Sequence, residues 1–274
     1  MRDSSKDTRK EIITFLGLTF LLSSIFYYLI TYSDALESIS LGLMWCPGIA
    51  AIVTRLIYNR NIRGLGWGPG NGKYLIFALF LPLLLCLVEY APVWLFAPDR
   101  FDHQFAREFL VPRKWLWVVV NLFGNLVFAL GEEIGWRGYF VPQLSRLTSF
   151  TKTVIISGFI WAVWHFPVII YTDYGIDIPI PYALLIFTLG LIMNSFIFTW
   201  FTLKSGSVWP AVVLHGAGNF FVQNIFERLL ITGHGPNYLT GEFGVVGGVV
   251  LFVAAIIFWR LKNRLPKESP ASFG

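Results

Sequence analysis

Three motifs place ionisable and amide side chains inside long apolar stretches of this 274-residue chain. They are Glu-Glu-Ile-Gly-Trp-Arg at 132–137, Trp-Ala-Val-Trp-His at 161–165 and His-Gly-Ala-Gly-Asn at 215–219. Holding one ionisable group at bilayer depth costs at least about 2.5–3.5 kcal/mol on insertion scales. A chain that keeps several such groups usually has a use for them, so these motifs are the candidates for chemistry.

Spacing within the motifs brings particular side chains together. Glu133 and Arg137 are four residues apart, share one helix face and are expected to pair. Glu132 points about 100° away from that face and is left without a local partner. His215 and Asn219 are also four residues apart and share a face.

The residue types of the three motifs suit hydrolysis by an activated water molecule. A carboxylate and an imidazole together can serve as general base and general acid. A second imidazole and an amide can donate hydrogen bonds to negative charge that develops on a carbonyl oxygen. No serine or cysteine nucleophile stands out, because Ser157 lacks a Gly-x-Ser-x-Gly setting and Cys46 and Cys86 lie in other apolar stretches.

Each motif also has a structural interpretation. The charges at 132–137 could mark the membrane–water boundary, and His165 could be a hydrogen-bonded core residue packed against the tryptophan one turn earlier. His215 could form a bond between helices, with Gly216 and Gly218 allowing close approach.

Other polar residues extend these motifs or stand apart from them. Two asparagines precede Glu132 on the same side of the expected helix, and two polar residues follow Asn219 in the same way: Asn121, Asn125, Gln223 and Glu227. The sequence assigns no role to the isolated Glu89 and Asn194.

Composition indicates the environment in which these motifs lie. Apolar residues make up 55% of the chain and charged residues 14%, against about 25% charged in soluble domains. This excludes a disordered chain and argues against a soluble enzyme. The net charge of +5 is no sign of nucleic-acid binding, because Lys and Arg cluster at the ends of the apolar runs.

The apolar runs predict an all-α, polytopic membrane protein. About 20 apolar residues in a helix span the bilayer core, and eight such spans are expected, near 12–31, 39–58, 74–97, 115–136, 153–171, 182–203, 207–230 and 243–260. We expect about eight transmembrane helices around a polar catalytic cavity. The organisation is then a basic cytoplasmic N-terminus (1–11), an eight-helix transmembrane domain (12–260) that contains the polar motifs, and a basic cytoplasmic tail (261–274).

The distribution of basic residues predicts the orientation. Lys and Arg concentrate on alternate connections, so the excess of positive charge places both ends in the cytoplasm. The first span is expected to be an uncleaved signal anchor. The segment 98–114 carries basic residues on the predicted outer side, and its mixture of Phe and charge predicts a short helix lying on the membrane.

These three motifs, in this order on separate membrane helices, resemble the CPBP family of CAAX-protease and bacteriocin-processing intramembrane proteases, also called the Abi family. That family includes the CAAX prenyl endopeptidase of the Rce-one type. The resemblance covers roughly 115–230, which it implies is the protease core, and it implies an eight-helix bundle with a cavity open to membrane and cytosol. One departure is Trp161, where the family usually has Phe, and it predicts an altered cavity shape.

The resemblance implies a role for each motif residue. Glu132 would activate the water with help from His165, and His215 and Asn219 would form the oxyanion hole. Glu133 and Arg137 would orient the first motif. Glu132, His165 and His215 could instead be zinc ligands, although metal-independent glutamate chemistry is the interpretation we favour.

The expected activity is therefore an intramembrane endopeptidase acting on a membrane-associated protein or peptide. A pheromone, a bacteriocin leader or a membrane-protein segment is expected as substrate rather than a prenylated CAAX protein, because short loops favour a prokaryotic cell membrane. Two alternatives stay open: a non-catalytic immunity or partner protein of the same family, and a proton-coupled transporter. The latter is disfavoured because no repeat with matching broken helices is visible.

Overall fold

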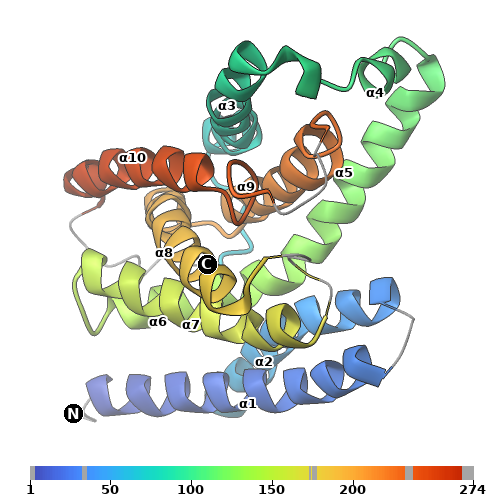
Figure 1. Ribbon diagram of the computed structural model, residues 1–274. Helices are drawn as coiled ribbons and strands as arrows, with labels where there is room; N and C mark the ends of the chain where they lie inside the picture. Colours follow the sequence, from blue (N-terminus) through green and yellow to red (C-terminus); the bar gives the residue numbers. More distant parts are fainter. Residues whose placement is uncertain (1–3, 33–35, 173, 175–177, 232–236, 267–274) are drawn as a thin grey trace.

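The computed structural model describes residues 4–32, 36–172, 174, 178–231 and 237–266. Within these ranges every regular element is a helix, and the one β-type contact is an isolated bridge between Phe101 and Leu230 (Figure 1). The predicted all-α membrane fold is confirmed. Helices are the expected solution, since every backbone polar group in lipid must be paired within its own segment.

The helices closely follow the predicted spans. In chain order they are α1 (Ser4–Tyr32), α2 (Leu36–Asn59), α3 (Gly72–Phe96), η1 (Pro98–Arg100), α4 (His103–Glu108), α5 (Pro112–Glu133), η2 (Ile134–Phe140), α6 (Val141–Ser145), α7 (Phe150–Tyr171), α8 (Ile180–Ser205), α9 (Trp209–Asn219), η3 (Phe220–Phe226), α10 (Val245–Leu261) and η4 (Lys262–Arg264).

Seven stretches of the described chain are long and apolar enough to cross a bilayer, one fewer than the eight expected. The difference is the segment 207–230. It forms the short helix α9 and then the π-helical η3, and its His, Asn and Gln side chains lower its hydropathy. Composition alone therefore does not identify it as a span.

Contacts between helix ends nevertheless show that α9 and η3 carry the chain across the bundle. On one face, the start of α1 meets the end of α2 through Thr14 and Tyr58, whose hydroxyls are 2.9 Å apart. On the same face, the start of α9 contacts the connection after α2, where the indole of Trp209 donates to the carbonyl of Trp67 at 2.9 Å.

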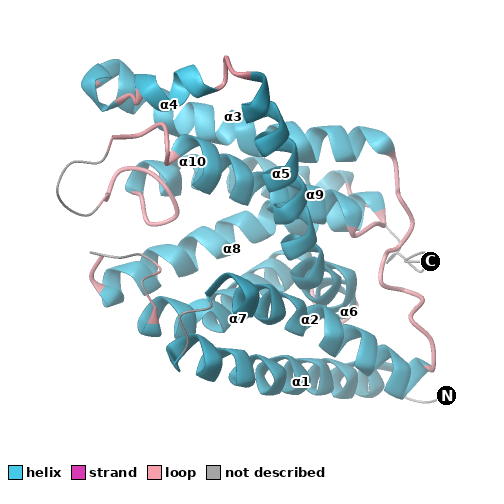
Figure 2. Cartoon of the chain, turned by 90° about the vertical axis from the view of Figure 1, so that its right-hand side faces the viewer, coloured by secondary structure: helices cyan, strands magenta, loops and turns pink. Residues whose placement is uncertain are grey.

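The remaining helix ends complete this assignment. The end of α8 meets the end of α10, where the Trp200 indole donates to the Leu261 carbonyl at 3.0 Å. On the opposite face, Tyr182 at the start of α8 donates to the carbonyl of Phe243, just before α10, at 3.2 Å. The described helices thus cross between the two faces eight times, with α1 beginning and α10 ending on the same face. Figure 2 shows these helices from the side.

The helices form a closed ring. Packing runs from α1 to α2, α5, α9, α3, α10, α8 and α7, and α7 returns to α1. A cavity of about 910 Å³ lies inside this ring, lined by residues of α2, α3, α5, α7, α8, α9, η3 and α10. Large apolar side chains such as Phe77, Phe123 and Phe252 are exposed on the outside, as expected for a surface that faces lipid.

The segment 98–114 contains the expected short helix. Asp102 caps α4 by accepting a hydrogen bond from the backbone N–H of Phe105 at 2.8 Å. The segment contacts the residues that follow η3, because the N–H of Ile231 donates to the carbonyl of Arg100 at 2.7 Å. Its position on a membrane surface stays a prediction.

We predict that Arg9 and Asn263 lie on the same, cytoplasmic side of the membrane and Arg107 on the other. Single cysteines at these exposed positions, in a chain whose buried Cys46 and Cys86 are replaced by Ala, would be treated with a membrane-impermeant maleimide. Labelling of positions 9 and 263 should require opening of the vesicle or cell, whereas position 107 should react from outside. Labelling of 9 and 263 from opposite sides would contradict the eight-passage fold.

Candidate active site

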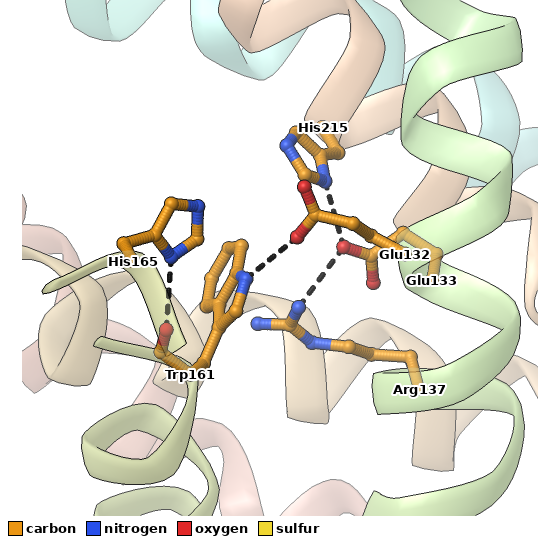
Figure 3. A network of polar contacts seen from close by, with 6 residues as sticks. All are labelled: Glu132, Glu133, Arg137, Trp161, His165 and His215. Atoms are coloured by element: carbon orange, nitrogen blue, oxygen red, sulfur yellow. Dashed lines mark hydrogen bonds and ion pairs between the residues drawn. The ribbon is translucent and has the colours of Figure 1, made fainter. Parts of the chain in front are cut away.

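The four residues expected to carry the chemistry line the same cavity. Glu132 is at the end of α5, His165 on α7, and His215 and Asn219 on α9. They therefore come together from three separate helices, and Figure 3 shows Glu132, His165 and His215 among them. Glu132 is 1% exposed and His215 8% exposed, so the bulk solvent barely reaches either side chain.

Glu132 is held by a hydrogen bond from the second motif. The indole Nε1–H of Trp161 donates to Oε2 of Glu132 at 2.8 Å. Its other oxygen, Oε1, has no hydrogen-bond partner among the described residues, so one oxygen of the carboxylate is fixed while the other stays free. A phenylalanine at position 161 could not make this bond, because its ring carries no donor.

Glu133 joins two helices through a single oxygen. Its Oε1 accepts a hydrogen bond from Nη1 of Arg137 at 2.9 Å and from Nδ1 of His215 at 2.8 Å. The pairing of Glu133 with Arg137 follows the four-residue spacing, and both side chains are almost completely buried. The guanidinium also stacks over the Trp161 ring at 3.9 Å, which adds a cation–π contact in a desolvated setting.

The hydrogen bonds of the two histidines define their protonation at Nδ1. A carboxylate accepts from Nδ1 of His215, and the carbonyl of Trp161 accepts from Nδ1 of His165 at 2.8 Å. Since carboxylate and carbonyl oxygens can only accept, both Nδ1 atoms carry hydrogen. Nε2 is then the ring nitrogen left for chemistry in each histidine.

Close backbone packing fixes the first motif against α2. A Cβ atom added to Gly131 would lie 2.6 Å from Trp45 and 2.8 Å from the carbonyl of Met44, and one on Gly135 would lie 2.4 Å from Pro47. Only glycine fits at these crossings. Glu132 and Glu133 lie between the two glycines, so the crossing of the helices sets the position of both carboxylates.

A second glycine crossing fixes α9 against α5. A Cβ atom on Gly216 would lie 2.9 Å from the backbone nitrogen of Leu126, and this approach lets His215 reach Glu133. Gly218 was expected to have the same packing role, but that expectation is wrong. Nothing lies within 4 Å of its Cβ position, because Gly218 borders the cavity.

One π-helical segment begins inside the first motif, and another begins directly after the third. The segment η2 follows Glu133, and η3 follows Asn219. Such segments are rare and often occur at functional sites, where the extra residue in the turn changes the direction of side chains. The sequence patterns did not predict them.

Polar contacts continue along α5 away from Glu132. Asn125 donates to the backbone carbonyl of Asn121 at 2.8 Å and to Oδ1 of Asn224 on η3 at 3.1 Å. Asn224 was not among the expected residues, because its partner is 99 positions away in the chain. The amide of Asn219 makes no hydrogen bond to another described residue and is therefore available to a ligand.

The proposed zinc set was tested against the donor geometry. In the described part of the chain, no group of three His, Cys, Asp or Glu side chains is placed to hold one metal ion. Glu132, His165 and His215 do not fit as a ligand set in this arrangement, and the steps proposed below use the groups of the chain itself.

Fold and site together define a class: a multi-pass membrane protein whose internal cavity holds a carboxylate, two imidazoles and an amide. Residues 113–221 match the family described as Type II CAAX prenyl endopeptidase Rce1-like, and all four cavity residues fall within the match. This part of the chain is therefore similar to the Rce1-like family.

The comparison with curated proteins also finds a protease. The chain is similar to CAAX prenyl protease 2 from Methanococcus maripaludis, with 34% identity over 147 residues. The aligned part is 51% of this chain and 52% of the relative, so the chain spans about half the length of the relative it matches.

We predict that Gly216→Ala lowers thermal stability and Gly218→Ala does not. The first substitution pushes a methyl group against the α5 backbone, and overpacking of this kind typically costs about 1–3 kcal/mol. The second adds the same methyl group to open space and should gain the slight helix preference of alanine. Thermal unfolding in detergent measures both, and equal shifts for the two variants would contradict the close crossing.

Proposed function

We propose that the chain is an intramembrane endopeptidase that hydrolyses a peptide bond of a membrane-associated protein or peptide. The observation that carries the proposal is that Glu132, His165, His215 and Asn219 line one cavity inside a ring of membrane helices. The match to a prenyl endopeptidase family and to a relative named as a protease supports it.

In the proposed reaction, Glu132 is the general base. Its free Oε1 takes a proton from a water molecule, and Nε2 of neutral His165 accepts the second hydrogen of that water and orients it. The resulting hydroxide attacks the carbonyl carbon of the peptide bond. A positioned carboxylate of this kind typically contributes about 10²–10⁴-fold to the rate.

The negatively charged oxygen that this attack creates, the oxyanion, then needs hydrogen-bond donors. The Asn219 amide can supply one, and Nε2–H of His215 can supply another when that ring is protonated. Glu133 supports the protonated form, because its carboxylate accepts from Nδ1 of His215 and stabilises the positive charge. When the carbon–nitrogen bond breaks, protonated Glu132 returns its proton to the leaving nitrogen, which restores the starting state.

The substrate class stays a prediction. The name of the relative concerns prenylated CAAX proteins, whereas the sequence favours a pheromone, a bacteriocin leader or a membrane-protein segment. All of these bring a peptide bond to the membrane, as the position of the cavity requires.

We predict that Glu132→Gln reduces peptide cleavage by about 10²–10⁴-fold, the contribution of a general base. Glutamine has the same shape, and its carbonyl can still accept from the Trp161 indole, so the fold should persist. Comparison of the membrane peptides of wild-type and Glu132→Gln cells by mass spectrometry would identify substrates, and the purified pair would then be assayed on them. Glu108→Gln on α4, outside the cavity, is the matched control.

This substitution also separates the competing functions. An immunity or partner protein should keep its biological effect in the Glu132→Gln variant. Turnover of a true substrate by that variant at the wild-type rate would refute the proposed chemistry.

We further predict that cleavage survives treatment with a zinc chelator. Elemental analysis of the purified, active protein should find zinc well below one atom per chain. Stoichiometric zinc, together with loss of cleavage on chelation and recovery on adding zinc back, would assign Glu132 to a metal site instead.

A further inference from the structure

The same cavity contains carboxylates that the proposed reaction does not use. Glu89 on α3 and Glu242, just before α10, line it together with Glu132, whereas no Lys or Arg of the described chain does. Neither Glu89 nor Glu242 forms an ion pair with a described Lys or Arg. The charged side chains of the cavity wall, histidines aside, are therefore all acidic.

Glu242 is a structural residue. Its Oε1 accepts from the Gln223 amide at 2.8 Å, and its Oε2 accepts from the Tyr174 hydroxyl. Burial and then the adjacent carboxylate raise the pKa of Tyr174 well above its ordinary range, so the phenol remains the proton donor. Glu242 thus attaches the segment before α10 to two other parts of the cavity wall.

Only one of the two carboxylate oxygens of Glu89 has a hydrogen-bond partner among the described residues. Glu89 is 7% exposed, and its Oε1 accepts from the backbone N–H of Gly241 at 2.7 Å. Its second oxygen has no hydrogen-bond partner among the described residues. A carboxylate in this position is costly without a partner for its charge, so Glu89 indicates a ligand that brings positive charge.

Two further acceptors surround Gly241. A Cβ atom built on this glycine, whose φ is +83°, would lie 2.8 Å from Oε1 of Glu227 and 3.7 Å from Oη of Tyr90. Tyr90 is fully buried at 0% exposure, and its hydroxyl has no hydrogen-bond partner within the described ranges. We refer to Glu89, Tyr90, Glu227 and Glu242, together with Gly241, as the Gly241 cluster. Glu89, Gly241 and Glu242 are its members that line the cavity.

The surroundings favour an organic cation over a metal ion. Among the described residues, no three acidic, His or Cys side chains are placed to hold one metal ion. Beside the cluster, the Tyr90 ring packs against Phe226 at 5.2 Å and Trp94 at 5.8 Å. Lysine and arginine combine a charged head with an apolar stem, which suits acidic groups next to aromatic walls.

We propose that the Gly241 cluster is a subsite that binds the positively charged side chain, Lys or Arg, of the peptide substrate. The identification of the ligand as substrate rests on the proposed function. An ammonium has three donors and no acceptor, which matches unengaged acceptors on Glu89, Glu227 and Tyr90. The subsite selects peptides with a basic residue and disfavours any segment that would place a carboxylate there.

The test measures binding by the inactive Glu132→Gln protein in nonionic detergent, so that it does not depend on cleavage. The probes are fluorescent apolar peptides of about 20 residues, a membrane-spanning length, with Lys, norleucine or Glu at successive positions. At one position or more, Lys should bind at least about tenfold more tightly than norleucine, the typical gain from a charged hydrogen bond, and Glu more weakly.

Adding Glu89→Gln should reduce the affinity for the Lys peptide to that for the norleucine peptide. Glutamine can still accept from Gly241, so the segment before α10 should keep its place. Glu227→Gln is a second variant that leaves the Gly241 contact untouched, and Glu108→Gln on α4 is the control that should keep the full preference for Lys.

The outcomes separate this subsite from the proposed function. Equal binding of Lys and norleucine peptides, or a preference unchanged by both Glu89→Gln and Glu227→Gln, would overturn the subsite even if wild-type protein cleaves peptides. A Lys preference lost in these variants, with no cleavage by wild-type protein, would support the subsite and remove the endopeptidase. If added phosphatidylethanolamine abolishes the preference, the subsite binds a lipid amine and the peptide assignment is wrong.

Discussion

The buried carboxylate of Glu133 is the group on which the arrangement of the site depends. One of its oxygens accepts from Arg137 on its own helical segment and from His215 on α9. Leaving one member of such a buried group without its partners typically costs about 3–5 kcal/mol, so the three side chains stabilise one another only as a set. This contact holds α9 against α5, fixes the ring of His215 and leaves the neighbouring Glu132 to face the cavity. Glu132 can therefore carry a free oxygen because Glu133 satisfies the charges behind it.

The helix bearing His215 and Asn219 shows what this arrangement requires of the backbone. α9 and η3 are short, polar and partly π-helical, and they would be poor membrane spans if lipid surrounded them. Irregular helices are tolerated at membrane depth where protein covers them, and α3, α5 and α8 pack around α9. The neighbouring helices thus supply the apolar surface that faces lipid, while α9 is free to carry amides and an imidazole. Glycine at position 216 allows the close approach that this division of roles needs.

Much of this could be predicted from the sequence, because helix spacing and apolar run length are local properties. The pairing of Glu133 with Arg137 followed from four-residue spacing, and seven spans followed from hydropathy. The contacts of Trp161 with Glu132 and of His215 with Glu133 join different helices, 29 and 82 positions apart, so no local pattern contains them. Trp161 gave only one signal, an indole N–H where the family usually has phenylalanine. Glu89 could not be given a role, since its importance arises from Gly241 in a distant segment.

The two acidic regions of the cavity differ in how their charge is balanced. Beside Glu132 and Glu133, the guanidinium of Arg137 lies behind the wall and offsets the carboxylates. In the proposed reaction, a neutral peptide bond would therefore approach without carrying a compensating charge. No such cation accompanies the Gly241 cluster in the part of the chain that the structure describes. Charges interact far more strongly in a poorly solvated cavity than in water, so a basic side chain bound there would be held firmly. Binding a remote group in this way orients the bond that reacts, and the unbalanced carboxylates would then determine which peptide bond reaches Glu132.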